Sequence, residues 1–394
     1  MNETTSFTAC YLFLTDDCNM RCSYCFESTN RCNNSYMSLE TAKKSVDFLI
    51  DNAIKHNIKL ITLTFFGGEP LLNLDVMTKI FPYAVAKGNE YNIQVRFAII
   101  TNGTIYNKEY EKFLLDVYKA TKYIDIQIST DGIPEVQDKN RVFIGNKPTS
   151  EVVLKNIIKL KSLFQNNQIS TSSIRTHAVL TKDNLSSLFL SYKYFKQLGI
   201  KNCEFILVNE ADWDEKDISI YSEQLSLITD YIYQQCVSTG SLEPYYEASG
   251  FAVQRRPNIT KYTCEAGKAL CSVAPNGDIY PCHRVYTYAP SKKIGNVFEG
   301  TVDENTVKRF FNTCREGMHA GNNSCGECQN TECVICMAYN NEKYGDMLKC
   351  SPSVCSMYKA KWNFIVETKK RFDKLYEKIN YNKCNETTFF KSIN

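Results

Sequence analysis

Three cysteines stand close together near the start of the sequence, within the stretch TDDCNMRCSYCFES at 15–28. Three residues separate Cys18 from Cys22, and two separate Cys22 from Cys25. Thiolates hold zinc ions and iron–sulfur clusters, and a closed structural site usually takes four of them. The odd number therefore predicts a 4Fe-4S cluster bound through three irons, with one iron left for a small molecule. A zinc loop that takes a distant fourth ligand is the alternative, although zinc loops prefer paired C-x2–4-C units.

A second stretch that could bind a ligand is FFGGEP, which contains Gly67, Gly68 and Glu69. Glycines let the backbone approach a ligand closely because they carry no Cβ, and the glutamate supplies a carboxylate for an ammonium group. Taken alone the stretch would be a tight turn, but it comes one strand–helix unit after the cysteines. Two more polar turns, TNG at 101–103 and STDG at 129–132, end the next two predicted strands.

These motifs lie in a region, about 8–210, where apolar strand-like runs alternate with helical periodicity. Six such units predict a parallel sheet covered by helices. Because a closed barrel has eight strands, we expect an open α/β fold, a partial (β/α)6 TIM barrel, with its functional loops at the C-terminal strand ends. The strands are expected at 11–15, 61–66, 93–100, 123–129, 173–181 and 203–208, and the helices at 38–56, 73–87, 107–120, 151–164 and 184–198, the last capped by Asn184 and closed by Gly199.

The rest of the chain predicts three further parts. A helical bridge at 211–254 contains a long polar helix near 214–238. The region 255–358 predicts a small Cys-rich α+β domain, held by metal sites rather than by a core. A C-terminal helix and tail at 359–394 completes the chain, and the residues that its helical pattern offers for packing are Trp362, Ile365, Phe372 and Tyr376.

The spacing Cys18-x3-Cys22-x2-Cys25, with Tyr24 before the third cysteine, resembles the signature of radical S-adenosyl-L-methionine (SAM) enzymes. The resemblance implies that the open iron chelates SAM, and that one electron from the cluster cleaves it to a radical that abstracts hydrogen from the substrate. It also implies that the FFGGEP turn contacts the methionyl amine and that Ser129 lies near the ribose. Phe26 would lie against the adenine or in the core. The implied cofactor-binding residues are Tyr24, Phe26, Gly67, Gly68, Glu69, Pro70, Thr101, Asn102, Ser129 and Asp131.

A second group of cysteines lies downstream and resembles a SPASM domain, a C-terminal extension of some radical SAM enzymes. A hairpin with its turn at Gly277 and Asp278 leads into Cys282, as in that domain. The resemblance implies two auxiliary 4Fe-4S clusters, and so three clusters in all. The implied ligands are Cys264, Cys271, Cys282 and Cys336 for the first and Cys325, Cys328, Cys333 and Cys355 for the second, with Cys350 an alternative to Cys355. A zinc ribbon remains open as an alternative, because C-x2-C pairs also suit zinc.

The composition indicates the compartment of the protein and the classes of partner that it does not favour. Eighteen cysteines without a signal peptide predict cytoplasmic metal or cluster sites rather than disulfides. The net charge of +3 gives no reason to expect a nucleic-acid partner. No apolar run has the roughly 18 residues that a membrane span needs. The other thiols are expected to be buried small hydrophobes or incidental, namely Cys10, Cys32, Cys203, Cys236, Cys314 and Cys384.

The function implied by the resemblance is peptide maturation. We expect hydrogen abstraction from a ribosomally made peptide and an oxidative crosslink, thioether or C–C, with a reductase such as flavodoxin or ferredoxin supplying electrons. Because the barrel starts near residue 8, a peptide leader would dock elsewhere than on an N-terminal domain. The alternatives are an anaerobic sulfatase-maturating (formylglycine-generating) enzyme and, from another class, a multi-cluster electron-transfer protein. The sulfatase group has an acid after the hairpin cysteine, whereas this chain has His283, a candidate catalytic base or a structural residue.

Overall fold

The computed structural model describes residues 6–27, 35–248, 264–308, 336–347, 349 and 351–391, with side chains described as far as 379. The chain forms two compact units. The first comprises Met1–His177, Thr263–Cys328 and Val334–Cys350. The second comprises Ala178–Tyr262, Gln329–Cys333 and Ser351–Asn394.

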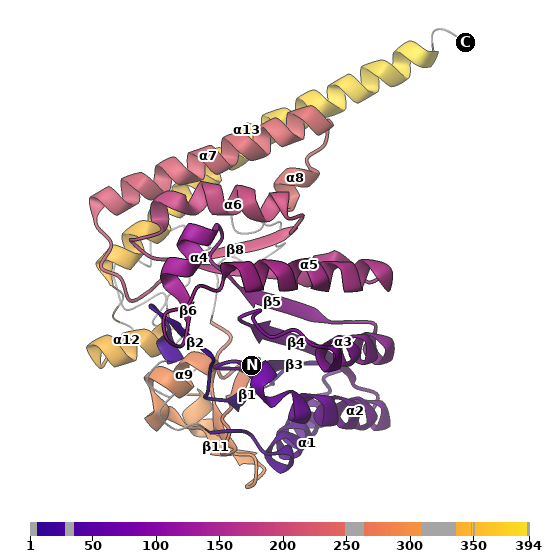
Figure 1. The fold of residues 1–394 in the computed structure, drawn as a ribbon, viewed down its shortest axis with the longest axis vertical. Coiled ribbons are helices and arrows are strands. Elements are labelled where there is room, and N and C mark those ends of the chain that lie inside the picture. The colour runs from indigo at the N-terminus through magenta and orange to yellow at the C-terminus, as the bar shows by residue number, and fades with distance from the viewer. Residues whose placement is uncertain are drawn as a thin grey trace. The chain divides into compact units, whose positions relative to one another are not determined.

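The first unit is built on a parallel sheet whose strands lie side by side in chain order (Figure 1). Cys10 pairs with Leu63, and Phe65 pairs with Ile99. This register places apolar residues of neighbouring strands side by side in the core. The strands are β1 (Ala9–Thr15), β3 (Leu60–Gly67), β4 (Gln94–Thr101), β5 (Asp125–Ser129) and the first part of β7 (Ile174–Leu180). These positions match the predicted strands within a few residues.

Helices connect these strands, as the periodicity predicts. In α1 (Leu39–Lys55), Ala42, Val46, Leu49 and Ala53 are buried, which is the apolar face read from the sequence. The helix begins at Ser38, whose hydroxyl accepts a hydrogen bond from the backbone N–H of Thr41. The other connecting helices are α2 (Leu74–Glu90), α3 (Lys108–Thr121) and α5 (Ser150–Asn166), with short elements η2 (Pro70–Asn73), α4 (Pro134–Asn140) and η3 (Thr171–Ser173) between them.

The predicted cysteine-region hairpin is confirmed, and it extends the same sheet. β9 (Leu270–Val273) runs parallel to β1, and β10 (Asp278–Tyr280) runs antiparallel to β9. Because β9 takes the free edge of β1, the sheet does not close into a barrel there, as predicted. The short strands β11 (Gly295–Asn296) and β12 (Thr301–Val302) continue the edge. The helices described in this region are α9 (His283–Tyr288), η5 (Pro290–Lys292) and α12 (Met337–Tyr344).

In the second unit, the end of β7 lies beside β8 (Asn202–Leu207), which supplies the sixth predicted strand. The long helix α7 (Glu215–Thr239) begins with a reciprocal capping box between Asp214 and Asp217. Helix α8 (Glu243–Tyr246) follows it, and the C-terminal helix α13 (Pro352–Lys391) packs on α7. On α13, Ile365 and Phe372 are buried as expected, whereas Tyr376 is 50% exposed.

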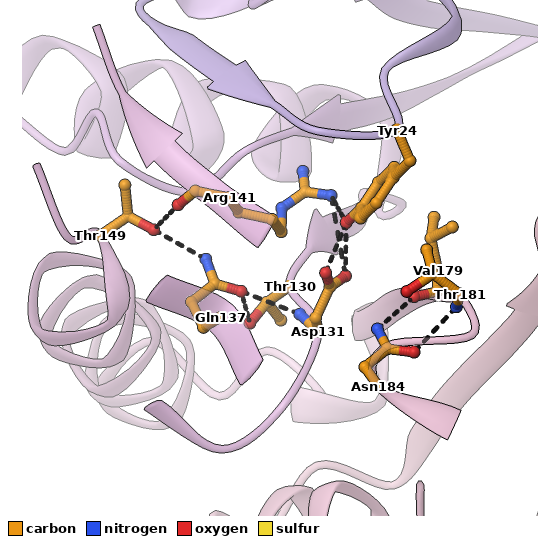
Figure 2. A network of polar contacts seen from close by, with 9 residues as sticks. All are labelled: Tyr24, Thr130, Asp131, Gln137, Arg141, Thr149, Val179, Thr181 and Asn184. Carbon is orange, nitrogen blue, oxygen red and sulfur yellow. Dashed lines mark hydrogen bonds and ion pairs between the residues drawn. The ribbon is translucent and has the colours of Figure 1, made fainter. Parts of the chain in front are cut away.

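One predicted helix cap is wrong. Asn184 precedes a short 3-10 turn, η4 (Leu185–Ser187), and only then does α6 (Leu188–Gln197) begin. Its side-chain amide forms hydrogen bonds with residues that precede it. The oxygen accepts from the Thr181 N–H, and the nitrogen donates to the Val179 carbonyl (Figure 2). Local turn hydrogen bonds compete with helix capping for such a side chain. Gly199, with φ of 68°, does follow the helix end as predicted. Within the described residues, no helix is long and apolar enough to cross a bilayer.

Candidate active site

The three clustered cysteines lie in the loop after β1, at the C-terminal end of that strand. Cys18 is buried, whereas Cys22 and Cys25 are partly exposed. The Cys18 sulfur accepts contacts from the Met20 N–H at 3.4 Å and from the Asn102 side-chain nitrogen at 3.7 Å. The Cys25 N–H donates to the Cys22 carbonyl at 3.3 Å. The protein backbone therefore orders this loop around its thiols.

A short antiparallel ladder holds the middle of this loop. β2 (Met20–Cys22) pairs with β6 (Arg141–Phe143), and Cys22 stands directly opposite Arg141. The next residue continues the contact, because the Ser23 N–H donates to the Asn140 carbonyl at 2.9 Å. Each strand has three residues, too few for a periodic signal in the sequence. Arg141 was therefore not expected from the sequence.

Tyr24 anchors the loop through a buried polar network (Figure 2). Its hydroxyl lies 2.6 Å from both carboxylate oxygens of Asp131 and accepts a hydrogen bond from the Arg141 guanidinium at 2.7 Å. The Asp131 N–H donates to Gln137, whose amide donates in turn to the Thr149 hydroxyl. Burial raises the pKa of Tyr24 well above its ordinary value, and nearby Arg141 opposes that shift. The phenol therefore stays neutral and donates to the carboxylate.

The two glycines of FFGGEP pack against the cysteine loop itself. A Cβ on Gly67, whose φ is +120°, would lie 2.2 Å from the Thr15 carbonyl oxygen. A Cβ on Gly68 would lie 2.2 Å from the Asp17 carbonyl oxygen. The backbone N–H groups of Gly68 and Glu69 donate to those same carbonyls, each at 2.9 Å. Only glycine allows this approach, so the turn fixes the backbone just before Cys18.

Glu69 is fully buried and ties together two strand ends. Its carboxylate accepts hydrogen bonds from the Leu71 N–H at 3.1 Å, the Thr101 hydroxyl at 2.8 Å and the Asn102 N–H at 2.7 Å. An ionised carboxylate has about four acceptor positions, so the three donors leave room for one more. Burial raises the pKa of Glu69 to about 7, against the lowering effect of these hydrogen bonds. The carboxylate can thus accept one further donor, such as an ammonium group.

The other expected cofactor contacts lie around the same edge. Pro70 begins the turn η2 and is buried. Ser129 ends β5 and stands opposite His177 of β7. Phe26, next to Cys25, lies 6.1 Å from the ring of His283 and 5.9 Å from that of Tyr288. The structure therefore brings all of the predicted SAM-contacting residues to the C-terminal ends of β1, β3, β4 and β5.

His283 begins α9 and lies within an aromatic wall formed with Tyr11, Phe66 and Phe26. The imidazole stacks on Tyr11 at 4.8 Å and meets the edge of Phe66 at 5.3 Å. Its Nδ1 is buried without a hydrogen-bond partner in the part of the chain that the structure describes. Burial, followed by the charge of Arg284 and the neighbouring His177, lowers the pKa of His283 to about 3. The ring is therefore neutral near pH 7, with one donor and one acceptor nitrogen.

Two further residues near this wall, His177 and Arg284, have no distinguishing pattern in the sequence. His177 has a pKa lowered to about 4, mainly by burial and then by Arg141 and other arginines. Arg284 covers the Phe26 ring, with 4.9 Å between guanidinium carbon and ring centroid. In the sequence, His177 is one residue of an ordinary strand pattern and Arg284 one basic residue among many. Their position beside the aromatic wall is visible only in the folded structure.

Helix α9 also contacts the start of the cysteine loop. The Tyr286 hydroxyl donates to the carboxylate of Asp16 at 3.1 Å, and its ring meets Phe13 at 4.7 Å. Burial raises the pKa of Asp16 to about 6. Since Cys282 immediately precedes α9, the auxiliary cysteine region and the loop of Cys18 share direct side-chain contacts.

Three of the predicted auxiliary ligands gather in one place. Cys264, Cys282 and Cys336 all pack against a small apolar cluster, whose buried members are Ala266, Ala274, Tyr280, Val285, Ala289, Met337 and Ala338. Burial and the neighbouring thiols of Cys264 and Cys336 raise the pKa of Cys282. Cys271 is not part of this group; it is fully buried in β9, opposite Cys10 of β1.

The second predicted auxiliary set is only partly visible. Cys325, Cys328, Cys333 and Cys350 lie outside the described residues, as do Cys32 and Cys314. Cys355 lies in the first turns of α13 and is partly buried. Cys203 and Cys236 are buried, as expected for small apolar side chains, and Cys10 is buried as well.

Family comparisons agree with this arrangement. Residues 12–187 match the Radical SAM superfamily, and residues 264–329 match SPASM, an iron–sulfur cluster-binding domain. The chain is a radical SAM protein with a SPASM domain. This membership confirms the resemblance read from the cysteine spacing and from the hairpin, and it makes the protein a radical SAM enzyme.

Three relatives show what this chain is similar to in sequence. A Methanocaldococcus jannaschii protein is 30% identical over 69% of this chain and 83% of its own length. A cysteine-type anaerobic sulfatase-maturating enzyme of Clostridium novyi is 26% identical over 75% of this chain and 79% of its own length. The radical SAM cyclopropyl synthase TigE of Paramaledivibacter caminithermalis is 24% identical over 92% of this chain and 74% of its own length.

The fold of this radical SAM protein also matches a solved structure. Native anSMEcpe with bound AdoMet and the Cp18Cys peptide superposes with a TM-score of 0.69. The match covers 95% of this chain and 99% of that chain at 20% identity. At this identity the likeness establishes the shared fold, which is the open α/β architecture predicted from the sequence.

The residues present fit the cofactors that these domains imply. Cys18, Cys22 and Cys25 follow β1 as thiols, and the buried Glu69 keeps an acceptor position for an ammonium group. Within the described residues, no three Cys, His, Asp or Glu side chains converge on a single metal ion.

Proposed function

We propose that this protein is a peptide maturase, which removes hydrogen from a ribosomally made peptide and closes an oxidative crosslink, thioether or C–C. The observation that carries the proposal is the contact between the cysteine loop and the auxiliary region, through Tyr286 and Asp16. An oxidative crosslink requires a second electron to leave the substrate. A cluster held beside the first site gives that electron a short path.

The cofactors supply the difficult chemistry, and the chain binds and orients them. When bound, a reduced 4Fe-4S cluster and SAM supply one-electron chemistry that removes a hydrogen atom from carbon. Cys18, Cys22 and Cys25 would hold the cluster, and Glu69 would accept the amine of the methionyl group. The ladder of β2 with β6 and the contact of Tyr24 with Asp131 hold the cysteine loop through contacts within the protein.

The substrate would meet the aromatic wall around His283. Tyr11, Phe66 and Phe26 supply apolar rings, and the Nδ1 of His283 supplies a polar atom without a partner among the described residues. Aromatic rings bind an extended peptide by burying its side chains and excluding water. We propose that the neutral ring of His283 forms a hydrogen bond with the substrate, because a pKa of about 3 makes it a weak base.

Relatives of both kinds support the general reaction and leave the substrate to experiment. TigE is named as a cyclopropyl synthase and the Clostridium novyi protein as a sulfatase-maturating enzyme. His283 stands where the sulfatase-maturating group has an acid, so we favour the peptide crosslink. The electron donor would be a flavodoxin or a ferredoxin, and the peptide would carry a leader. The thiol-rich sites require a reducing compartment, which agrees with the cytoplasm.

The test is mass spectrometry of peptides co-expressed anaerobically with this protein. Candidate peptides come from short reading frames next to its gene, and a sulfatase-derived peptide containing cysteine serves as the comparison. The proposal predicts a peptide lighter by two hydrogens, with the change mapped to linked side chains. Formylglycine in the sulfatase peptide, with no change in any candidate, would replace it with the sulfatase function.

A further inference from the structure

We infer that Cys271 is not a cluster ligand but one half of a buried thiol pair with Cys10, which joins the cysteine-rich hairpin to barrel strand β1. The inference concerns the ligand set of the SPASM domain, so it is independent of which substrate the enzyme modifies. It corrects the ligand role that the cysteine pattern implies for Cys271.

The strand register places the two thiols side by side. β9 runs parallel to β1, and Cys271 stands directly opposite Cys10 in that pairing. Both side chains are 0% exposed. The Cys271 sulfur contacts the Ala9 carbonyl oxygen at 3.8 Å and the neighbouring thiol of Cys10. The thiol is therefore enclosed between two strands of a continuous sheet.

The other predicted ligands of this cluster lie at the ends of helices and strands. Cys264 precedes β9, Cys282 follows β10 and caps α9, and Cys336 caps α12. All three lie at element ends and pack on one shared apolar cluster, which does not include Cys271. Cluster ligands need space beside them for irons and sulfides. Loops and the ends of helices and strands provide that space, whereas the closely packed interior between two paired strands does not.

The contact between Cys10 and Cys271 has a structural role in positioning β9 on β1. Small buried thiols act as apolar side chains, and the Cys10–Cys271 contact fixes the register of β9 on β1. That register sets the position of Cys282 and α9 relative to the loop of Cys18. The hydrogen bond between Tyr286 and Asp16 is a second contact between the hairpin region and that loop. A one-residue slip of β9 would turn its side chains to the opposite face.

The experiment measures iron and sulfide per chain in four single variants reconstituted anaerobically and purified as folded protein by size exclusion. Cys271→Ala and Cys10→Ala form the matched pair, and Cys264→Ala and Cys282→Ala are the ligand comparison. We expect wild-type iron in the first two and a loss of about four irons in each of the second two. The electron paramagnetic resonance signals of the auxiliary clusters should be unchanged in Cys271→Ala.

Thermal unfolding tests the contact between Cys10 and Cys271 separately from the iron content. Cys10→Ala and Cys271→Ala should each lower Tm, and the double variant should lower it by less than the sum, because the residues share one contact. Cys271→Ser serves if the alanine variant does not fold. Loss of about four irons from folded Cys271→Ala or Cys271→Ser, or full retention of iron by Cys282→Ala, would overturn the inference.

Discussion

The hydroxyl of Tyr24 lies 2.6 Å from both carboxylate oxygens of Asp131, which joins the cysteine loop to the end of β5. The same hydroxyl accepts from Arg141, and Arg141 stands opposite Cys22 in the β2–β6 ladder. Figure 2 shows the three side chains meeting at one point. A signature tyrosine expected near the cofactor thus also fixes the loop that carries the thiols.

Replacing Arg141 with glutamine should strongly destabilise this loop. The Arg141 and Asp131 side chains are 8% and 0% exposed, so the change leaves a buried carboxylate without its cation. The expected loss in the free energy of unfolding is about 3–5 kcal/mol, measured by chemical denaturation of the cofactor-free protein. The control is Lys55→Gln, because that residue pairs with Glu304 on the surface, where the side chains are 62% and 41% exposed. It should cost less than about 1 kcal/mol, and equal losses in the two variants would contradict the account.

Replacing Gly68 with alanine should displace the backbone before Cys18. The added Cβ would lie 2.2 Å from the Asp17 carbonyl oxygen, which must move. We expect a destabilisation of about 1–3 kcal/mol and reduced iron in the first cluster. Gly300→Ala is the matched control, because a Cβ there meets nothing within 4 Å although φ is +69°. Normal iron content in Gly68→Ala would show that the close approach does not order the cysteine loop.

Glu69 should make the stability of the cofactor-free protein depend on pH. Burial raises its pKa from 4.5 to about 7, so the folded state takes up a proton that the unfolded chain holds less tightly in this range. The free energy of unfolding should therefore increase as the pH falls from about 7 toward about 4.5, through this group alone. Denaturation of wild type and Glu69→Gln across this range isolates the effect. If both proteins show the same pH dependence, the carboxyl is not the titrating group.

The same carboxyl should govern SAM binding to the cluster-loaded protein. An ammonium group pairs with the ionised form, so affinity should fall as the pH drops below about 7. Glu69→Gln should bind SAM about tenfold to a hundredfold more weakly near pH 8, since charge-assisted hydrogen bonds contribute about 1.5–3 kcal/mol. Isothermal titration calorimetry at several pH values measures both effects. Unchanged affinity in Glu69→Gln would mean that the amine binds elsewhere.

Local patterns predicted much of this protein. The helix from Ser38 and the strands around Phe65 and Ile99 follow from apolar periodicity, because each buries one face or both. The spacing of Cys18, Cys22 and Cys25 predicted the family, because residues 12–187 match the Radical SAM superfamily.

Contacts between distant segments escaped prediction. Tyr24 and Arg141 are 117 positions apart and meet through strands of three residues each. The parallel pairing of β9 with β1 joins Cys271 to a strand 262 positions earlier. Cysteine spacing counts residues and contains no information on which way a thiol faces, so Cys271 could not be separated from Cys264 and Cys282 by pattern. Asn184 shows the same limit, because its loop contacts outcompete a cap.

The most direct test of the central claim is formation of 5′-deoxyadenosine from SAM by the reconstituted protein with dithionite, measured by liquid chromatography and mass spectrometry. The account predicts product from the wild type and none from the variant in which Cys18, Cys22 and Cys25 are alanine. The variant should also contain about four fewer irons. A wild-type protein with its full iron content that leaves SAM intact, or a triple variant that still cleaves it, would contradict the account.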